Sequence, residues 1–268
     1  MAKTEPSHYT FGDQGPAAER LRRLASLYLP LSRSALEEAV AGVGQPIALA
    51  IDLGSGPGYT TELVADVSAA ARVIGFERSA EFCEGARARI PRDIEFMEHD
   101  VSTEDLQCKD VDLAFCRFLL THLADPIATL RRWHAALRPG GILVLIELEQ
   151  LSSTDPTLAI YYEIIDGVQA QHGQQMYIGG ALEGQAREAG YEIVTSRVID
   201  PGIAAASMAS LHRPNLENVR KDPWVQENYS ETELDAVADG LERIAAENAG
   251  KTPIENLLRV VLARRVEA

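Results

Sequence analysis

The sequence contains few cysteines and no long hydrophobic run. Cys83, Cys108 and Cys116 are three in number and lack the spacing of a metal site, so we expect reduced thiols in a cytoplasmic protein. No apolar run approaches the roughly 20 residues that a membrane span needs. Residues 1–6 have no apolar core of the kind found in signal peptides. These absences predict a protein that is not associated with a membrane.

Basic residues are also scarce. The chain has 25 Lys and Arg residues against 40 Asp and Glu residues, for a formal net charge of −15, and no lysine-rich run. Such a charge repels the phosphates of nucleic acids, so we expect no nucleic-acid partner. A length of 268 residues suits one large domain, or one domain with an appended cap.

The chain does have a glycine-rich turn between a predicted strand and a predicted helix. The aliphatic run 47–53 is too short for a typical helix and predicts a buried strand. Gly54, Gly56 and Gly58 follow at alternate positions, and a helical pattern begins near Thr60. Such a corner binds phosphates or nucleotides in doubly wound α/β sheets, because glycine lets the backbone approach a ligand closely.

The spacing of these glycines disfavours two common nucleotide-binding loops. A dinucleotide-binding turn requires a third glycine where this chain has Tyr59, and a phosphate-binding P-loop requires a lysine that is absent. Asp52 stands just before the turn. Its charge would repel a phosphate but suits a cationic amino-acid ligand.

The pattern Asp52-x-Gly54-x-Gly56-x-Gly58 resembles motif I of the class I S-adenosylmethionine (SAM)-dependent methyltransferases. Later stretches are similar to the same family and follow in its order. The second strand, at 72–77, ends in Glu77, and the third, at 94–98, is followed by His99-Asp100-Val101. The fourth strand, at 111–116, is followed by the run from Arg117 to Leu123. The turn Leu137-Arg138-Pro139-Gly140-Gly141 precedes a fifth strand at 142–147. The resemblance covers about residues 47–150.

The resemblance implies a SAM site at the carboxyl ends of the strands. The glycine loop would surround the methionine part, and Glu77 would bind the ribose hydroxyls, a role that suits an acid at a second strand end. Asp100 would accept a hydrogen bond from the adenine amino group, and the Val101 N–H would face the ring. The cofactor-binding candidates are Asp52, Gly54, Ser55, Gly56, Gly58, Glu77, Arg78, Asp100, Val101 and Arg117.

Catalytic residues are harder to identify, because methyl transfer from a sulphonium mainly requires positioning and the exclusion of water. His122 follows the fourth strand and is the first candidate, as a base or as a donor that orients the substrate. Glu147 and Glu149 are second candidates, since alternation puts both on one face of the fifth strand. Arg117 occupies the strand end where a cation-dependent enzyme would need acids, so we expect no metal.

The predicted fold is an α/β, Rossmann-like doubly wound sheet of seven strands, because βαβ units favour parallel neighbours. The resemblance adds that the last strand, at 257–265, is antiparallel. We expect a helix that starts near Pro16 and a second that starts near Ser34. We expect four segments: an N-terminal lid with helices at 1–45, a SAM-binding core at 46–199, a helical cap insertion at 200–255 and a final core strand at 256–268. Within the cap insertion, Ser230 and Glu233 form the capping box of a helix.

The sequence therefore predicts a SAM-dependent methyltransferase that acts on a small organic molecule. Its alanine and arginine usage is typical of high-GC bacteria, where the acceptor would be a secondary metabolite. Two alternatives stay open: an enzyme that uses the same SAM site for decarboxylation or cyclisation, and a non-catalytic SAM-binding protein. We expect a cytoplasmic monomer or homodimer.

Overall fold

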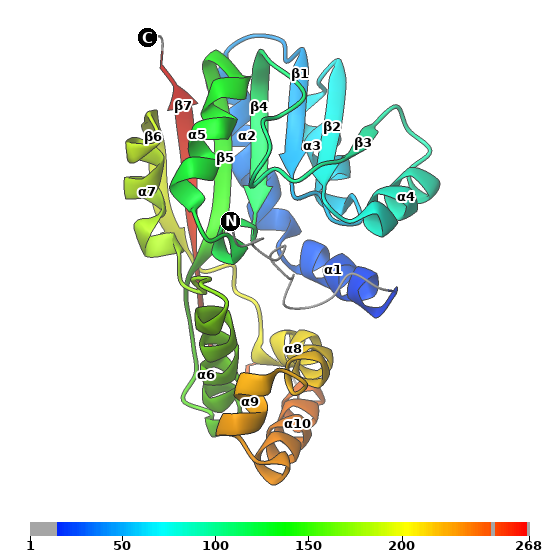
Figure 1. The fold of residues 1–268 in the computed structure, drawn as a ribbon, viewed down its shortest axis with the longest axis vertical. Coiled ribbons are helices and arrows are strands. Elements are labelled where there is room, and N and C mark those ends of the chain that lie inside the picture. The colour runs from blue at the N-terminus through cyan, green and yellow to red at the C-terminus, as the bar shows by residue number, and fades with distance from the viewer. Residues whose placement is uncertain (1–14, 248–249, 267–268) are drawn as a thin grey trace, which may run out of the picture.

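The computed structural model describes residues 15–247 and 250–266 of the chain. These residues form one seven-stranded sheet in the order β3-β2-β1-β4-β5-β7-β6, which fills the upper half of Figure 1. The strands are β1 Leu49–Leu53, β2 Arg72–Glu77, β3 Glu95–Glu98, β4 Val111–Arg117, β5 Leu137–Ser152, β6 Tyr191–Ile199 and β7 Glu255–Arg265. β1 to β5 pair in parallel, and β7 pairs antiparallel with both β5 and β6. The predicted Rossmann-like sheet with an antiparallel last strand is confirmed.

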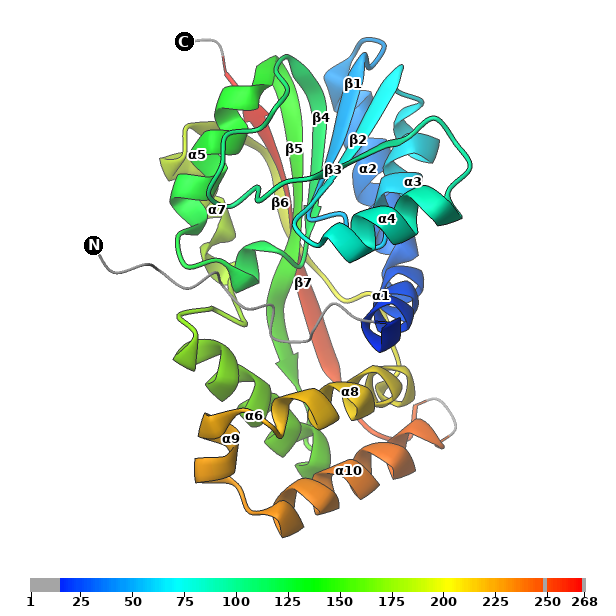
Figure 2. The ribbon, with the colours of Figure 1, turned by 45° about the vertical axis from the view of Figure 1, so that its right-hand side comes forward.

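Helices cover both faces of the sheet (Figure 2). One face carries α2 (Leu29–Val43), α3 (Tyr59–Ser68) and α4 (Ala80–Arg89), and the other carries α5 (Pro126–Ala136) and α7 (Gly179–Glu188). The interior strand β1 is buried along its whole length. Helices on both faces explain why its sequence reads as a continuous aliphatic run rather than an alternating one.

A helical lobe lies at the carboxyl ends of the strands, in the lower part of Figure 1. It consists of α6 (Pro156–Gln171), α8 (Ala205–Val219), α9 (Pro223–Asn228) and α10 (Glu231–Ala245). α10 has the predicted capping box: the Glu233 N–H donates to the Ser230 hydroxyl, and the Glu233 carboxylate accepts from the Ser230 N–H at 2.8 Å. The sequence did not indicate α8 or α9, and the division of the chain into four segments stays a prediction.

β5 and β7 are longer than predicted and run beyond the other strands toward the helical lobe (Figure 2). Their antiparallel pairing continues to Ser152 and Glu255, with an irregularity between Leu148 and Gln150. In this extension the backbone N–H and C=O groups of each strand hydrogen-bond to the other strand, so the pair can run beyond the sheet without a third strand. The extension brings the helical lobe under the sheet.

Two helices precede the sheet. α1 (Gly15–Leu27) lies between the sheet and the helical lobe in Figure 2. The predicted start of the second helix near Ser34 is wrong, because α2 begins at Leu29 and Ser34 lies inside it. Pro30 explains the earlier start, since its fixed φ and missing N–H suit the first turn of a helix. Residues 1–14 of the predicted lid lie outside the described residues.

Candidate active site

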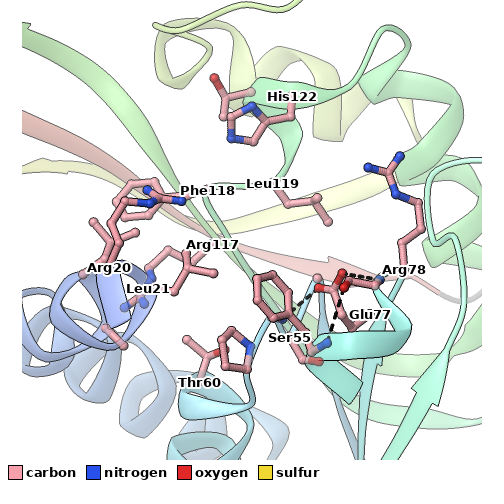
Figure 3. Close-up of a pocket in the computed structure, with 18 of the residues that line it drawn as sticks. Arg20, Leu21, Ser55, Thr60, Glu77, Arg78, Arg117, Phe118, Leu119 and His122 are labelled. Atoms are coloured by element: carbon pink, nitrogen blue, oxygen red, sulfur yellow. Dashed lines mark hydrogen bonds between the residues drawn. The ribbon is translucent and has the colours of Figure 1, made fainter. Parts of the chain in front are cut away.

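A cavity of about 380 Å³ lies between the carboxyl ends of the strands, helix α1 and the helical lobe (Figure 3). One side is lined by the glycine loop, the end of β2, residues 99–102 and the loop after β4. The other side is lined by residues of α1, α6 and α8. Ligands of open α/β sheets bind outside the carboxyl ends of the strands, so this cavity is the candidate site.

The glycine loop forms part of the cavity wall, but its three glycines serve different purposes. All three have positive φ, at 73° for Gly54, 52° for Gly56 and 86° for Gly58. Gly54 and Gly56 line the cavity, whereas Gly58 does not. A Cβ on Gly58 would lie 2.8 Å from Cζ of Phe96. The predicted cofactor contact of Gly58 is therefore not supported, and this glycine instead allows the start of α3 to pack against Phe96.

Asp52 also lies behind the cavity wall rather than in it. Its side chain is 1% exposed, and its carboxylate accepts hydrogen bonds from the hydroxyls of Thr60 at 2.6 Å and Thr61 at 2.7 Å. Burial raises its pKa to about 6. The direct ligand contact expected of Asp52 is not supported by this geometry. Its contacts instead hold the first turn of α3 beneath the glycine loop.

Glu77 ends β2 and connects the glycine loop to the cavity. Its carboxylate accepts hydrogen bonds from the backbone N–H of Gly56 at 2.8 Å and of Ser79 at 2.8 Å. Burial raises the pKa of this carboxyl, and the hydrogen bonds from the backbone oppose that rise. Glu77 lies beside Arg78 in Figure 3, and both line the cavity with Ser55. Each Glu77 oxygen has a further lone pair, so binding to the ribose hydroxyls stays a prediction that this geometry allows.

Asp100 and Val101 line the same side of the cavity. Asp100 accepts a hydrogen bond from the Ser102 N–H at 2.9 Å, and the Val101 carbonyl accepts one from the Trp133 indole at 2.9 Å. Packing against Trp133 thus fixes the segment that is expected to face adenine. Phe82 also lines this side, and no pattern in the sequence indicated it.

Arg117 lines the cavity at the end of β4. Its guanidinium donates to the Ser32 hydroxyl at 2.7 Å and lies 5.6 Å from the centroid of the Phe118 ring. Burial lowers its pKa to about 10, while the negative charge of Asp52 opposes the fall. Arg117 is therefore a cation at neutral pH, held in place by a residue of α2.

Glu147 does not line the cavity. Its side chain is fully buried, and its carboxylate accepts the backbone N–H groups of Leu119 at 2.9 Å and Leu120 at 2.8 Å. The catalytic contact expected of Glu147 is not supported, because the residue lies beneath the loop that it holds. Glu149 is no alternative, since its carboxylate pairs with Arg259 at 2.7 Å.

His122 does line the cavity, as predicted for a residue near the substrate. Figure 3 shows it above Leu119, on the loop that Glu147 holds. Its Nδ1 lies 3.5 Å from the Gln174 side-chain oxygen, and burial lowers its pKa to about 4. The ring is therefore neutral at pH 7, which suits a hydrogen-bonding role better than that of a strong base.

Several lining residues were missed because they come from helices far away in the sequence. They are Arg20 and Leu21 on α1, Gln169 on α6, and Met208, His212 and Asn215 on α8. No motif surrounds any of them, so no local signal could have identified them. Only the packing of α1 and the helical lobe brings them to the cavity.

Comparisons with known proteins agree with this geometry. Residues 51–145 match the family model of a methyltransferase domain. An uncharacterised 37.1 kDa protein in transposon Tn4556 of Streptomyces fradiae is 32% identical over 71% of this chain and 58% of its own length. Trans-aconitate 2-methyltransferase of Methylobacterium radiotolerans is 38% identical over 54% of this chain and 49% of its own. The chain thus spans about half the length of the curated relatives it matches.

A solved structure has the same fold. It is phosphoethanolamine N-methyltransferase 2 of Haemonchus contortus in complex with phosphomonomethylethanolamine and S-adenosylhomocysteine. The TM-score is 0.61 at 13% identity, and the match covers 100% of this chain and 62% of that one. At this identity the likeness shows the fold alone. Together, the matched domain, the strand order and the glycine loop place residues 51–145 in the class I SAM-dependent methyltransferase family, whose cofactor is SAM.

Proposed function

We propose that this chain transfers the methyl group of SAM to a small organic molecule. The observation that carries the proposal is the shape of the cavity, which continues from the loop at Gly54 and Gly56 to the side chains of α6 and α8. One part offers the carboxylates of Glu77 and Asp100, which suit hydroxyl and amino groups. The other part is enclosed by the helical lobe and offers room for an acceptor beside the cofactor.

The residues of this chain would act by binding, orienting and excluding water. When bound, SAM supplies a methyl group that its sulphonium already makes electrophilic. Residues 118, 119, 121 and 122 of the loop after β4 line the cavity, and Glu147 fixes that loop through the N–H groups of Leu119 and Leu120. A fixed loop holds the acceptor close to the methyl group and keeps water away, and such positioning supplies much of the rate of a transfer reaction.

Two observations support a small acceptor rather than a polymer. The site is a cavity of about 380 Å³, and the net charge of −15 disfavours a nucleic acid. The relative from Methylobacterium radiotolerans is named for a small molecule, trans-aconitate. Trans-aconitate is therefore one member of the panel of small acids to test as acceptors.

Calorimetry and an activity assay test this function on the purified chain. We expect SAM and S-adenosylhomocysteine (SAH) to bind and NAD not to bind, because the glycine spacing does not fit a dinucleotide. We expect SAH to form when SAM is supplied with an acceptor from a panel that includes trans-aconitate. Binding of NAD without binding of SAM would refute the proposal. Turnover of a substrate without SAH formation would instead support a reaction that uses SAM without methyl transfer.

We predict that His122→Ala lowers kcat about three- to tenfold and leaves the affinity for SAH unchanged, because a neutral histidine orients the substrate and takes up no proton. The pKa of His122 is lowered to about 4, mainly by burial. The ratio of wild-type to variant kcat should therefore be constant from pH 6 to pH 8.

His172→Ala is the matched control, because His172 is exposed and pairs with Asp222 outside the cavity. It should have the wild-type kcat. A 10²-fold or larger loss of kcat in His122→Ala would contradict this role. If the kcat of the wild type also titrates between pH 6 and 7 and that of the variant does not, His122 is a general base instead.

Location and assembly stay predictions. No helix among residues 15–247 and 250–266 has the length and apolar character needed to cross a membrane. We propose, from composition alone, that the protein acts in the cytoplasm as a monomer or homodimer.

A further inference from the structure

The end of the cavity next to the helical lobe contains a group of polar side chains. They lie away from the residues that are expected to bind the cofactor. Arg20 reaches this end from α1, Tyr161 from α6, and His212 and Asn215 from α8. We call these four residues the cap cluster. Figure 3 shows Arg20 on the opposite side of the cavity from Glu77 and Arg78. The cap cluster is thus well placed to contact an acceptor substrate.

The two residues that α8 contributes to the cap cluster each have a polar atom without a hydrogen-bond partner among the described residues. His212 and Asn215 are each 6% exposed, and His212 Nε2 and Asn215 Oδ1 are buried without a partner. The rest of each side chain is held, because His212 stacks on Tyr161 with ring centroids 4.4 Å apart and Asn215 hydrogen-bonds Tyr161. A buried polar atom without a partner costs about 1–3 kcal/mol, so two such atoms at one cavity wall indicate a missing ligand.

Among the described residues, the charged side chain at this end is a cation. Burial, together with the nearby charge of Arg20, lowers the pKa of His212 to about 3, and burial likewise lowers that of His122 to about 4. Both rings are neutral at pH 7, which leaves Arg20 as the cation of this end. Among the described residues that line the cavity, the carboxylates are Glu77 and Asp100, and both belong to the cofactor side. An anionic group therefore suits the cap cluster.

Apolar side chains also line the cavity. They are Leu148 and Leu151 of β5, Ile165 of α6, Met176, and Met208 of α8. An acceptor in the cavity therefore meets apolar walls as well as the cap cluster, and such walls favour an apolar body over a highly charged one.

We propose that the cap cluster binds the carboxylate of an apolar-bodied hydroxy acid and so holds this class of acceptor, with the methyl-accepting atom on the part of the acid that faces the cofactor. Arg20 pairs with the carboxylate, and the Nε2–H of neutral His212 donates to it. Asn215 Oδ1 accepts from the neighbouring hydroxyl. The proposal rests on the proposed function, because it names the substrate class of the same cavity. Arginine suits this role because its planar guanidinium holds a carboxylate by two parallel hydrogen bonds.

Calorimetry on the full chain tests the proposal with mandelate, 3-phenyllactate and salicylate, each beside its neutral amide, with and without saturating SAH. We expect at least one acid to bind about tenfold more tightly than its amide, because only the acid can pair with Arg20. If no acid is preferred while SAH still binds, the cap cluster proposal fails and the proposed function stands. If the acid binds and SAH does not, the proposed function fails and the acid site stands.

Variants assign the binding to named residues. Arg20→Gln should weaken acid binding about tenfold or more, and His212→Phe, which keeps the stacking on Tyr161, about three- to tenfold. The matched control is Arg23→Gln, since Arg23 lies on the same helix and pairs with Glu19 on the surface; it should bind the acid as wild type does. If Arg20→Gln does not unfold cooperatively, His212→Phe decides. Wild-type acid affinity in a folded Arg20→Gln or His212→Phe would overturn the assignment.

Discussion

Replacing Gly56 with valine should abolish measurable SAM binding while the protein stays folded. Gly56 lines the cavity, and a Cβ there would meet Leu21 Cδ1 at 3.6 Å, so the larger side chain points into the space between the glycine loop and α1. It would fill space that the ligand needs and would strain the loop, because φ at this position is 52°. We expect the dissociation constant for SAM to rise about 100-fold or more by calorimetry.

Gly44→Val is the matched control for Gly56→Val. It introduces the same backbone strain at a positive φ but leaves the space for the ligand unchanged. Gly44 ends α2 with φ of 70° and does not line the cavity. A Cβ at this position would have no neighbouring atom within 4 Å, so a side chain there meets open space. Both variants should lose about 1–3 kcal/mol of stability through backbone strain. Only Gly56→Val should lose SAM binding. Equal SAM affinity in Gly56→Val and wild type would show that the loop is not the cofactor site.

Replacing Glu147 with alanine should cost about 2–5 kcal/mol of folding free energy, measured by urea unfolding at pH 6. The carboxylate is fully buried and accepts the N–H groups of Leu119 and Leu120, so its removal leaves two buried donors without an acceptor. These donors belong to the loop that also carries His122. We therefore expect kcat to fall as well.

Glu147→Gln is the matched variant, because its amide oxygen can still accept both N–H groups but its side chain does not titrate. Burial raises the pKa of Glu147 to about 8, above its ordinary value. Its contribution to stability is therefore fully present below about pH 4.5 and is lost as the pH rises through 8. The stability of the wild type relative to Glu147→Gln should fall between pH 5 and pH 8. A difference that does not change with pH, or a stable Glu147→Ala, would contradict this role.

The positions of the strands could be predicted from the sequence, because the strands are short aliphatic runs followed by turns. β1, β2 and β4 lie close to their predicted positions, and the cavity is lined by Gly54, Gly56, Glu77, Arg78, Asp100, Val101, Arg117 and His122, together with Ser55. A loop that must adopt positive φ next to a ligand requires glycine, so its residues are visible in the sequence itself.

The carboxylates of Asp52, Glu147 and Glu149 do not line the cavity, although the sequence made them candidates for the site, and one reason applies to all three. A sequence shows that a carboxylate follows a strand, but not whether it faces a cavity or a neighbouring segment. Asp52 faces the hydroxyls of α3, Glu147 faces the backbone of its neighbouring loop, and Glu149 faces Arg259. Their partners lie 8 to 110 residues away along the chain.

The half of the cavity that contains the glycine loop is readable in the sequence, whereas the half under α1, α6 and α8 follows from tertiary packing. The first half is built by turns at consecutive strand ends, where local residue preferences shape the backbone. The second half contains Arg20, Tyr161, His212 and Asn215, which lie on three separate helices. Those helices meet because α6 packs against the extended β5 and against α8, while α8 packs against α1, and a helix pattern does not reveal which partner its apolar face will find.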